Sequence, residues 1–172
     1  NYKSTVDALP HFLDQKNVDL FTRHQIFSIT EMHSRYEILM ENYCKTISIE
    51  AQTMLEMVHR EIIPAVCAYQ KDLSSTASLK QGLAADLNCS LEKMVLANLS
   101  RLSAELYQNA LSLERELMEA KTQEDLHSQA QAYRSNVLTA MQEVRNVADQ
   151  LETITGKDYW PFPTYSDLLY SV

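Results

Sequence analysis

Apolar side chains recur every three or four positions over a long, unbroken stretch of this chain. This spacing places one apolar stripe along an α-helix, because about 3.6 residues complete a helical turn. The stripe starts just after Ser28-Ile29-Thr30-Glu31, and a hydroxyl followed three residues later by a carboxylate is typical of a helix N-terminus. We therefore predict a helix over about 30–73, a rod of roughly 65 Å. The apolar positions are Met32, Tyr36, Met40, Tyr43, Ile47, Ala51, Met54, Val58, Ile62, Ala65, Tyr69 and Leu73.

Pro64 interrupts the hydrogen bonding of this predicted helix. A proline has no N–H to donate to the carbonyl four residues earlier, and its ring crowds that carbonyl. The apolar stripe nevertheless continues past Pro64. We therefore expect a bend near Glu61 rather than the end of the helix.

Two further stripes predict two more long helices. The polar residues 74–78 are the first segment able to turn the chain and cap a new helix, which predicts helices over about 77–121 and 123–155. A shorter apolar pattern predicts a helix over about 5–23, where Pro10 lies close enough to the start to be tolerated. The second stripe comprises Leu79, Leu83, Leu87, Leu91, Val95, Leu99, Leu102, Leu106, Ala110, Leu113 and Leu117. The third comprises Leu126, Ala130, Tyr133, Val137, Met141, Val144, Ala148 and Leu151.

The scarcity of turn-forming residues limits the ways in which these helices can be joined. Only 2 Gly and 4 Pro occur, so the connections must be short, and short connections make neighbouring helices antiparallel. We predict an all-α fold: an elongated antiparallel bundle of three long helices and the short N-terminal helix over 1–156. An extended tail rich in Pro and aromatic residues follows over 157–172.

Charge and cysteine content exclude several classes of partner. The formal net charge of -8 repels a nucleic-acid backbone, and no apolar run approaches the roughly 20 residues that cross a bilayer. Cys44, Cys67 and Cys89 are odd in number and widely spaced, which favours reduced thiols over a disulfide framework. We therefore expect a cytoplasmic protein that binds neither nucleic acid nor membrane.

The C-terminal tail concentrates apolar surface in a short segment that must pack on something. Pro161 and Pro163 hold this segment extended. It could be a strap folded back over the bundle, or an anchor that docks on another domain or subunit. The sequence favours neither interpretation over the other. The predicted interface anchors are Trp160, Phe162, Tyr165, Leu168 and Leu169.

Two stretches of sequence resemble the C-terminal helical region of type III glutamine synthetases. The first runs from Ser34-Arg35-Tyr36-Glu37-Ile38-Leu39-Met40-Glu41-Asn42-Tyr43 through Ile49-Glu50-Ala51 to Ile63-Pro64-Ala65. The second is the ending Trp160-Pro161-Phe162-Pro163-Thr164-Tyr165-Ser166-Asp167-Leu168-Leu169. The resemblance implies a parent enzyme that joins glutamate and ammonia at the expense of ATP, with Mg or Mn, in a large cytoplasmic ring assembly.

The resemblance assigns this chain a structural role within that parent. The family's metal-binding carboxylates and phosphate-binding arginines lie on a curved sheet of the catalytic domain, and no motif of that kind occurs here. No catalytic, cofactor-binding or metal residue is therefore carried over. The partners it implies are the upstream catalytic domain of the same chain and neighbouring subunits of a homo-oligomer.

A pair of E-x-x-H motifs raises the alternative of a di-metal helical enzyme. These motifs are Glu56/His59 and Glu124/His127, and di-iron bundles use such a pair. In an up-down-up bundle the two motifs would lie roughly 40 Å apart along the axis, too far for one metal pair. Glu56 also precedes Arg60 by four residues, the spacing of a surface ion pair.

Three functional hypotheses therefore remain open. The leading one is an assembly domain of a glutamate-ammonia ligase. The second is a free-standing helical adaptor that recognises partner proteins along one face. The third, a di-metal enzyme, would require bound iron or manganese.

Overall fold

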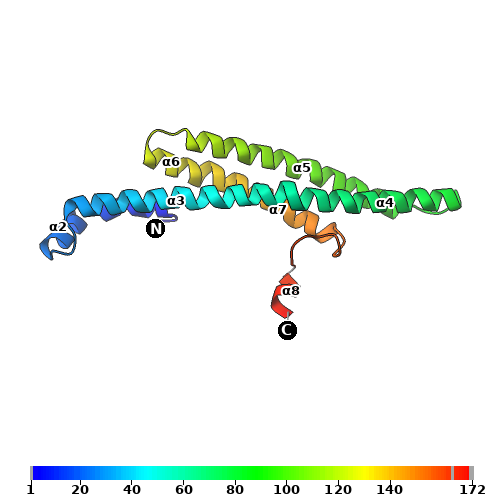
Figure 1. Ribbon diagram of the computed structural model, residues 1–172, viewed down its shortest axis with the longest axis horizontal. Helices are drawn as coiled ribbons and strands as arrows, with labels where there is room; N and C mark the ends of the chain where they lie inside the picture. Colours follow the sequence, from blue (N-terminus) through cyan, green and yellow to red (C-terminus); the bar gives the residue numbers. More distant parts are fainter. Residues whose placement is uncertain (1, 164, 171–172) are drawn as a thin grey trace. The chain divides into compact units, whose positions relative to one another are not determined.

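The computed structural model describes residues 2–163 and 165–170, and the regular elements in these ranges are all helical (Figure 1). The predicted all-α fold is confirmed. The α-helices are α1 (Thr5–Ala8), α2 (Gln15–Arg23), α3 (Ile29–Met57), α4 (Ile63–Leu83), α5 (Ser90–Lys121), α6 (Leu126–Ala132), α7 (Leu138–Ile154) and α8 (Tyr165–Tyr170). A 3₁₀ turn, η1, spans Leu9–Leu13, and two π-helical turns span Val58–Ile62 (η2) and Tyr133–Val137 (η3).

The helices form two compact units where the sequence predicted one bundle over 1–156. Unit 1 comprises Asn1–Gln52 and Leu113–Met141, and unit 2 comprises Thr53–Ser112 and Gln142–Val172. The chain leaves each unit and returns to it through helices that contribute to both, namely α3, α5 and α7. The tail predicted over 157–172 therefore belongs to unit 2.

Unit 1 is built on the first half of the predicted first stripe. The side chains of Met32 and Met40 are fully buried, and Tyr36 and Tyr43 are half-buried beside them. The ion pair between Arg134 and Asp7 joins η3 to α1. The other buried side chains of unit 1 are Val6, Cys44, Ile47, Ala51, Leu113, Leu117, Ala120, Ala130, Tyr133, Val137 and Ala140.

Unit 2 buries further parts of the three stripes. Its largest fully buried side chains are Leu99, Leu106 and Leu151. Because α4 and α5 are joined by a short connection, residues 84–89, they run antiparallel. The other buried apolar residues of unit 2 are Leu55, Val58, Ile62, Val66, Ala77, Cys89, Leu102, Ala110, Val144 and Val147.

Side-chain caps form the starts of two helices, and the sequence indicated the one made by Ser28 and Glu31. The Ser28 N–H donates to the Glu31 carboxylate at 2.7 Å, and the Glu31 N–H donates to the Ser28 hydroxyl at 3.3 Å. These hydrogen bonds from Ser28 lower the pKa of Glu31. At the start of α6 the Asp125 carboxylate accepts from the Ser128 N–H at 2.8 Å. Both contacts satisfy backbone donors that a helix leaves without partners.

Pro64 is accommodated by a π-helical turn, and the helical path continues through it from Ile29 to Leu83. The Ile63 N–H donates to the Val58 carbonyl, five residues back. The predicted bend position, Glu61, lies within this π turn. The missing N–H of Pro64 is thus absorbed by a local change of hydrogen-bond spacing rather than by a break.

The prediction that residues 74–78 turn the chain was wrong. These residues are helical, and α4 continues to Leu83. Their hydroxyls donate to carbonyls of their own helix, for example Ser75 to Lys71 at 2.9 Å and Thr76 to Asp72 at 2.8 Å. Serine and threonine hydroxyls that bond back in this way are compatible with a helix interior, so a polar cluster alone does not end a helix.

The chain turns instead at residues 84–89, and this changes which leucines are buried. The stripe is buried or half-buried from Val95 onward, but Leu79, Leu83, Leu87 and Leu91 are exposed. The inward positions near the turn are taken by Ala77, Cys89 and Glu92. The prediction that these four leucines belong to the buried stripe was therefore wrong.

The N-terminal helix predicted over 5–23 is also divided. It consists of α1, the 3₁₀ turn η1 and α2, with Asp14 in a non-helical conformation (φ -57°, ψ 140°) between the last two. Pro10 lies in η1 and offers no N–H to an earlier carbonyl, which favours the tighter 3₁₀ spacing over a continuous α-helix.

Replacing Leu106 with Ala should destabilise the chain, because its side chain is fully buried in unit 2. The expected loss is about 2–5 kcal/mol, from lost burial and a residual cavity. The matched control is Leu111→Ala on the same helix, where the side chain is 39% exposed and the loss should be much smaller. Urea unfolding followed by the helical circular dichroism signal measures both. Equal losses would contradict the assigned core.

The ion pair between Lys80 and Glu92 predicts a specific pH dependence. Lys80 donates to the Glu92 carboxylate, whose side chain is only 8% exposed, and this bond lowers the pKa of Glu92 below its ordinary value of 4.5. A carboxylate with a depressed folded-state pKa stabilises the fold above the unfolded pKa, and that stabilisation disappears as pH falls through the folded value. We expect Glu92→Gln to lower stability at neutral pH and to flatten the decline below pH 4.5.

The urea midpoint measured at neutral pH and at about pH 3 tests this expectation. Glu56→Gln serves as the control, because its pair with Arg60 is exposed on both sides and should contribute little. Identical pH profiles for the Glu92→Gln and Glu56→Gln variants would show that the Lys80 contact does not affect stability.

Candidate interaction surface at the C-terminal tail

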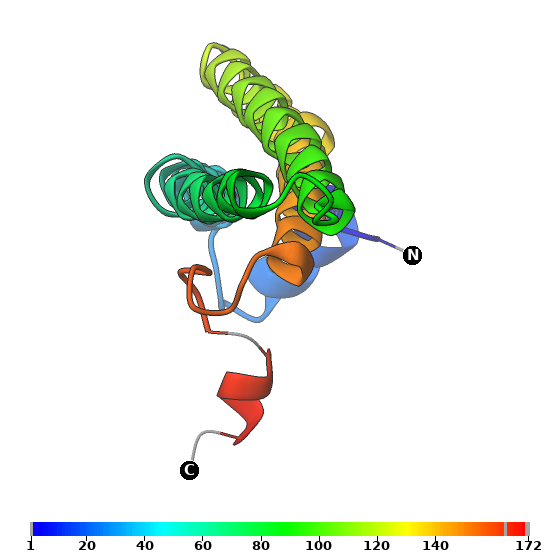
Figure 2. The same cartoon turned by 90° about the vertical axis from the view of Figure 1, so that its right-hand side faces the viewer.

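The chain turns after α7, which ends at Ile154, and the tail follows (Figure 2). Gly156 lies in this turn. The N–H groups of Tyr159 and Trp160 both donate to the Gly156 carbonyl, at 2.9 and 3.2 Å. A Cβ at position 156 would lie 3.2 Å from Tyr69 Cε2 and 3.3 Å from Tyr159 Cδ2. A side chain at this position would therefore be crowded by two aromatic rings, which would have to shift by a few tenths of an ångström to admit it.

Tyr159 fixes the start of the tail to α4. Its ring packs on that of Tyr69, with centroids 5.0 Å apart, and its hydroxyl donates to the Asp72 carboxylate at 2.5 Å. This hydrogen bond to Asp72 raises the pKa of Tyr159. One aromatic side chain thus supplies both an apolar and a polar contact to unit 2.

The predicted anchors Trp160 and Phe162 pack against each other. Both side chains are half-buried, with ring centroids 6.3 Å apart at an interplanar angle of 80°. Such an edge-to-face arrangement is favourable for aromatic pairs. The exposed Pro161 lies between them in the chain.

The predicted anchors Leu168 and Leu169 lie in α8 and are exposed. Their relative exposure is 62% and 74%. The side chain of the fifth predicted anchor, Tyr165, lies outside the part of the chain that the structure describes. Lys157 and Asp167 pair at 2.7 Å, with 71% of the lysine side chain exposed, so this contact holds α8 only weakly.

The two interpretations of the tail therefore apply to different parts of it. Residues 156–159 pack on α4, as a strap would, whereas the leucines of α8 remain open, as an anchor would. The sequence did not indicate Tyr69 or Asp72 as partners, because they precede Tyr159 by just over half the chain. The available signal for a packed turn was the aromatic Tyr159 three residues after Gly156.

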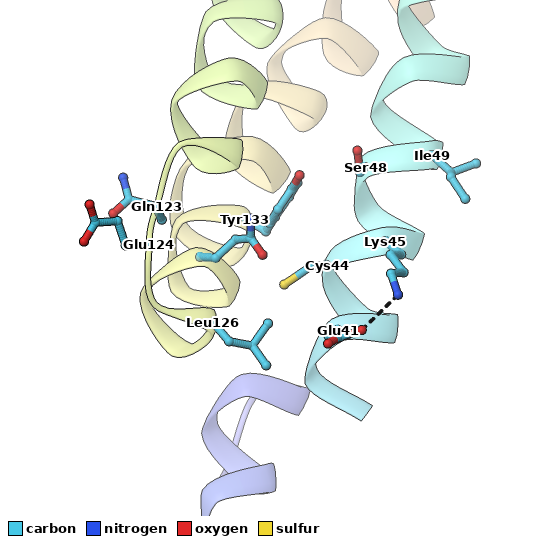
Figure 3. Close-up of a pocket in the computed structure, with 10 residues that line it drawn as sticks. Glu41, Cys44, Lys45, Ser48, Ile49, Gln123, Glu124, Leu126 and Tyr133 are labelled. Atoms are coloured by element: carbon cyan, nitrogen blue, oxygen red, sulfur yellow. Dashed lines mark hydrogen bonds and ion pairs between the residues drawn. The ribbon is translucent and has the colours of Figure 1, made fainter. Parts of the chain in front are cut away.

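Unit 1 contains an open groove between α3 and the start of α6 (Figure 3). Its volume is about 570 Å³, and the close-up shows Cys44 of α3 and Leu126 of α6 pointing into the space between the two helices. Glu41 and Lys45 pair at 2.9 Å on its rim. Burial raises the pKa of the Cys44 thiol, which keeps it protonated and a poor nucleophile. The groove therefore lacks an activated cysteine.

The two E-x-x-H motifs are not part of a metal site in the described residues. No three His, Cys, Asp or Glu side chains of residues 2–163 and 165–170 are grouped closely enough to hold a metal ion. Glu56 pairs with Arg60 at 2.7 Å, as its spacing suggested, and His59 packs edge-on against Tyr107. Glu124 and His127 are exposed.

None of the helices in the described ranges combines enough length with enough apolar character to cross a bilayer. All three cysteines are free thiols, with Cys44 and Cys89 buried and Cys67 exposed.

Fold and tail together define an all-helical domain whose last helix leaves apolar side chains open. Residues 1–81 match the family described as the glutamine synthetase C-terminal domain. All 172 residues align with a glutamine synthetase of Butyrivibrio fibrisolvens at 38% identity, covering 25% of that protein. The chain belongs to the family of glutamine synthetase C-terminal domains, as the resemblance of its sequence indicated.

Further relatives agree with this assignment. A type-3 glutamine synthetase of Dictyostelium discoideum is 33% identical over 177 residues, which cover 99% of this chain and 24% of that protein. A glutamine synthetase of Bacteroides fragilis is 23% identical over 172 residues, covering 96% of this chain and 23% of that protein. The chain thus spans about a quarter of the length of the curated relatives it matches.

Replacing Tyr159 with Ala should release the start of the tail from α4. The change removes the ring contact with Tyr69 and the hydrogen bond to Asp72 together. Amide hydrogens of residues 156–163 should then exchange faster, while those in the middle of α7 should not change. Tyr107→Ala, which removes a ring that is 45% exposed on α5, is the control. Unchanged exchange of residues 156–163 would contradict the attachment.

Proposed function

We propose that this chain is a non-catalytic assembly and interaction domain of a type III glutamine synthetase. The parent reaction in this proposal is the ATP-dependent ligation of ammonia to glutamate to give glutamine. The domain's task is to hold the catalytic part of the enzyme and neighbouring subunits in position. The observation that carries the proposal is that the whole chain matches about a quarter of the length of a glutamine synthetase. The exposed leucines of α8 add a surface through which it could bind a partner.

The architecture of the tail supports an interaction role. Tyr159 and Gly156 hold its first residues on α4, so the remainder starts from a defined position. Leu168 and Leu169 then project apolar surface that unit 2 leaves uncovered. Because the start of the tail is attached, its remainder loses less freedom on binding than a wholly free chain end would, which suits a docking segment.

In this proposal ATP and its Mg or Mn ions bind outside the chain. Mg or Mn carried by a nucleotide is usually held by one or two carboxylates together with the phosphates. We place that site in the catalytic part of the parent, and in keeping with this no three metal-ligating side chains are grouped in the described residues. The residues of this chain would then act on the reaction only through the position of that catalytic part.

The proposed partners are the upstream catalytic domain of the same chain and neighbouring subunits of a homo-oligomer. Apolar residues of α8 suit a protein surface, and the net charge of -8 opposes association with nucleic acid. We place the protein in the cytoplasm, where free thiols such as the exposed Cys67 stay reduced.

Replacing Trp160 and Phe162 together with Ala tests this function. Each ring can bury on the order of 150–250 Å², so the double variant should weaken subunit assembly of the full-length parent and reduce its rate of glutamine formation. The control replaces Glu37 and Glu50, both exposed, with Ala and should leave assembly unchanged. Size-exclusion chromatography with light scattering, and a glutamine assay, report the two quantities.

The melting temperature of the 172-residue chain separates anchor from strap. If Trp160 and Phe162 dock on a partner, the variant chain should melt close to the original while the parent loses assembly. If the two rings serve only unit 2, the chain itself should melt several degrees lower. Intact assembly and activity of the variant parent would refute the proposed function of the tail.

A further inference from the structure

Five large apolar side chains are exposed around the turn between α4 and α5 in unit 2. We call this patch the leucine tip, comprising Leu79, Leu83, Leu87, Leu91 and Met94. The relative exposure of these five side chains is 74%, 83%, 41%, 63% and 60%. They come from the end of α4, the connection over 84–89 and the start of α5, which Figure 1 draws as one hairpin.

Two contacts on the inner side of the hairpin keep these side chains outward. The Cys89 thiol donates to the Ala77 carbonyl at 3.6 Å, and Lys80 pairs with the Glu92 carboxylate. Ala77, Cys89 and Glu92 are all buried and occupy the space between the two helix ends. The leucines therefore cannot rotate inward without breaking this packing.

The leucine tip is comparable in size to patches that are often functional. Its five side chains expose apolar area on the order of 500 Å², within the roughly 300–600 Å² of the largest patch on a typical monomer. Two such patches facing each other would bury on the order of 1,000 Å², which is near the lower limit for a specific protein interface.

Charge decides which occupant fits the leucine tip. Over residues 79–94 the basic side chains Lys80 and Lys93 balance the acidic side chains Asp86 and Glu92, so this stretch is neutral. The chain as a whole carries -8, and two copies repel each other over most of their surface. The tip is a place where two copies can approach without adding like charge. An anionic membrane surface would instead be repelled by the rest of the chain.

We propose that the leucine tip binds the leucine tip of a second copy of this chain. The contact is isologous, so the same residues face each other across a two-fold axis. Leu83, the last residue of α4, and Leu87, within the connection, lie at its centre. The inference deepens the proposed function, since it names a subunit contact of the assembly domain, but it uses a surface separate from the tail.

Gly82 provides a direct test, because a Cβ added there meets no atom within 4 Å. In the full-length protein we would introduce Gly82→Cys together with Cys67→Ser, which removes the exposed native thiol. Mild oxidation should link two copies through position 82. The control is Gln108→Cys in the same background, an exposed position on α5 away from the tip. We expect roughly tenfold more linked dimer from position 82, because contact raises the local thiol concentration.

A second variant tests the energetics without any crosslink. Leu83→Gln with Leu87→Gln keeps the charge and removes apolar surface from two exposed positions, so it should leave folding intact. Analytical ultracentrifugation over a range of concentrations should show tip-mediated association weakened at least tenfold. Equal crosslinking at positions 82 and 108, or unchanged association of the double-glutamine variant, would overturn the proposal. Binding of the tip to lipid vesicles in place of a second copy would overturn it as well.

The outcome is independent of the test of the tail. If the tip proposal alone fails, the Trp160 and Phe162 variant still reduces assembly while the tip variants do not. If the proposed function alone fails, the tip crosslink still forms while the Trp160 and Phe162 variant assembles and synthesises glutamine normally.

Discussion

The fold of this chain depends on each long helix burying one continuous apolar stripe. Many of the polar pairs that the structure gives, such as Glu41–Lys45 and Arg101–Glu105, lie within a single helix and are exposed, so they contribute little to joining helices. Side chains such as Met40, Leu99 and Leu106 are instead completely removed from water. Burial of large apolar side chains is the main favourable contribution to folding, which makes the stripes the principal constraint on where helices can run.

This dependence explains what could be predicted from the sequence. The three-and-four spacing of apolar residues and the capping pair Ser28 and Glu31 are local signals, and they identified the long helices and the start of the first of them. The same reasoning failed at residues 74–78, because hydroxyls that would cap a new helix can equally bond back to their own. A regular leucine spacing across 79–91 then concealed the real turn.

Contacts between residues far apart in sequence could not be predicted. Nothing in the sequence around Asp72 indicates a hydrogen bond from Tyr159. The four-residue spacing of Leu79, Leu83 and Leu87 is the same whether these side chains are buried in a stripe or exposed at a tip. The candidate site was found as an aromatic concentration, but its division into an attached start and an open end depended on the three-dimensional positions of α4 and α8. The apolar surface left open at the tip and at α8 is what remains after the helices have buried their stripes.

The two π-helical turns, Val58–Ile62 in unit 2 and Tyr133–Val137 in unit 1, have a consequence for how related chains can differ in length. A π turn contains one residue more than the α-helical turn that it replaces. Losing one residue there converts it into a regular turn and keeps the flanking inward faces aligned. The same deletion in the middle of α3 would rotate every following side chain by about 100° and carry the stripe away from the core. Single-residue gaps between relatives therefore belong at these two turns.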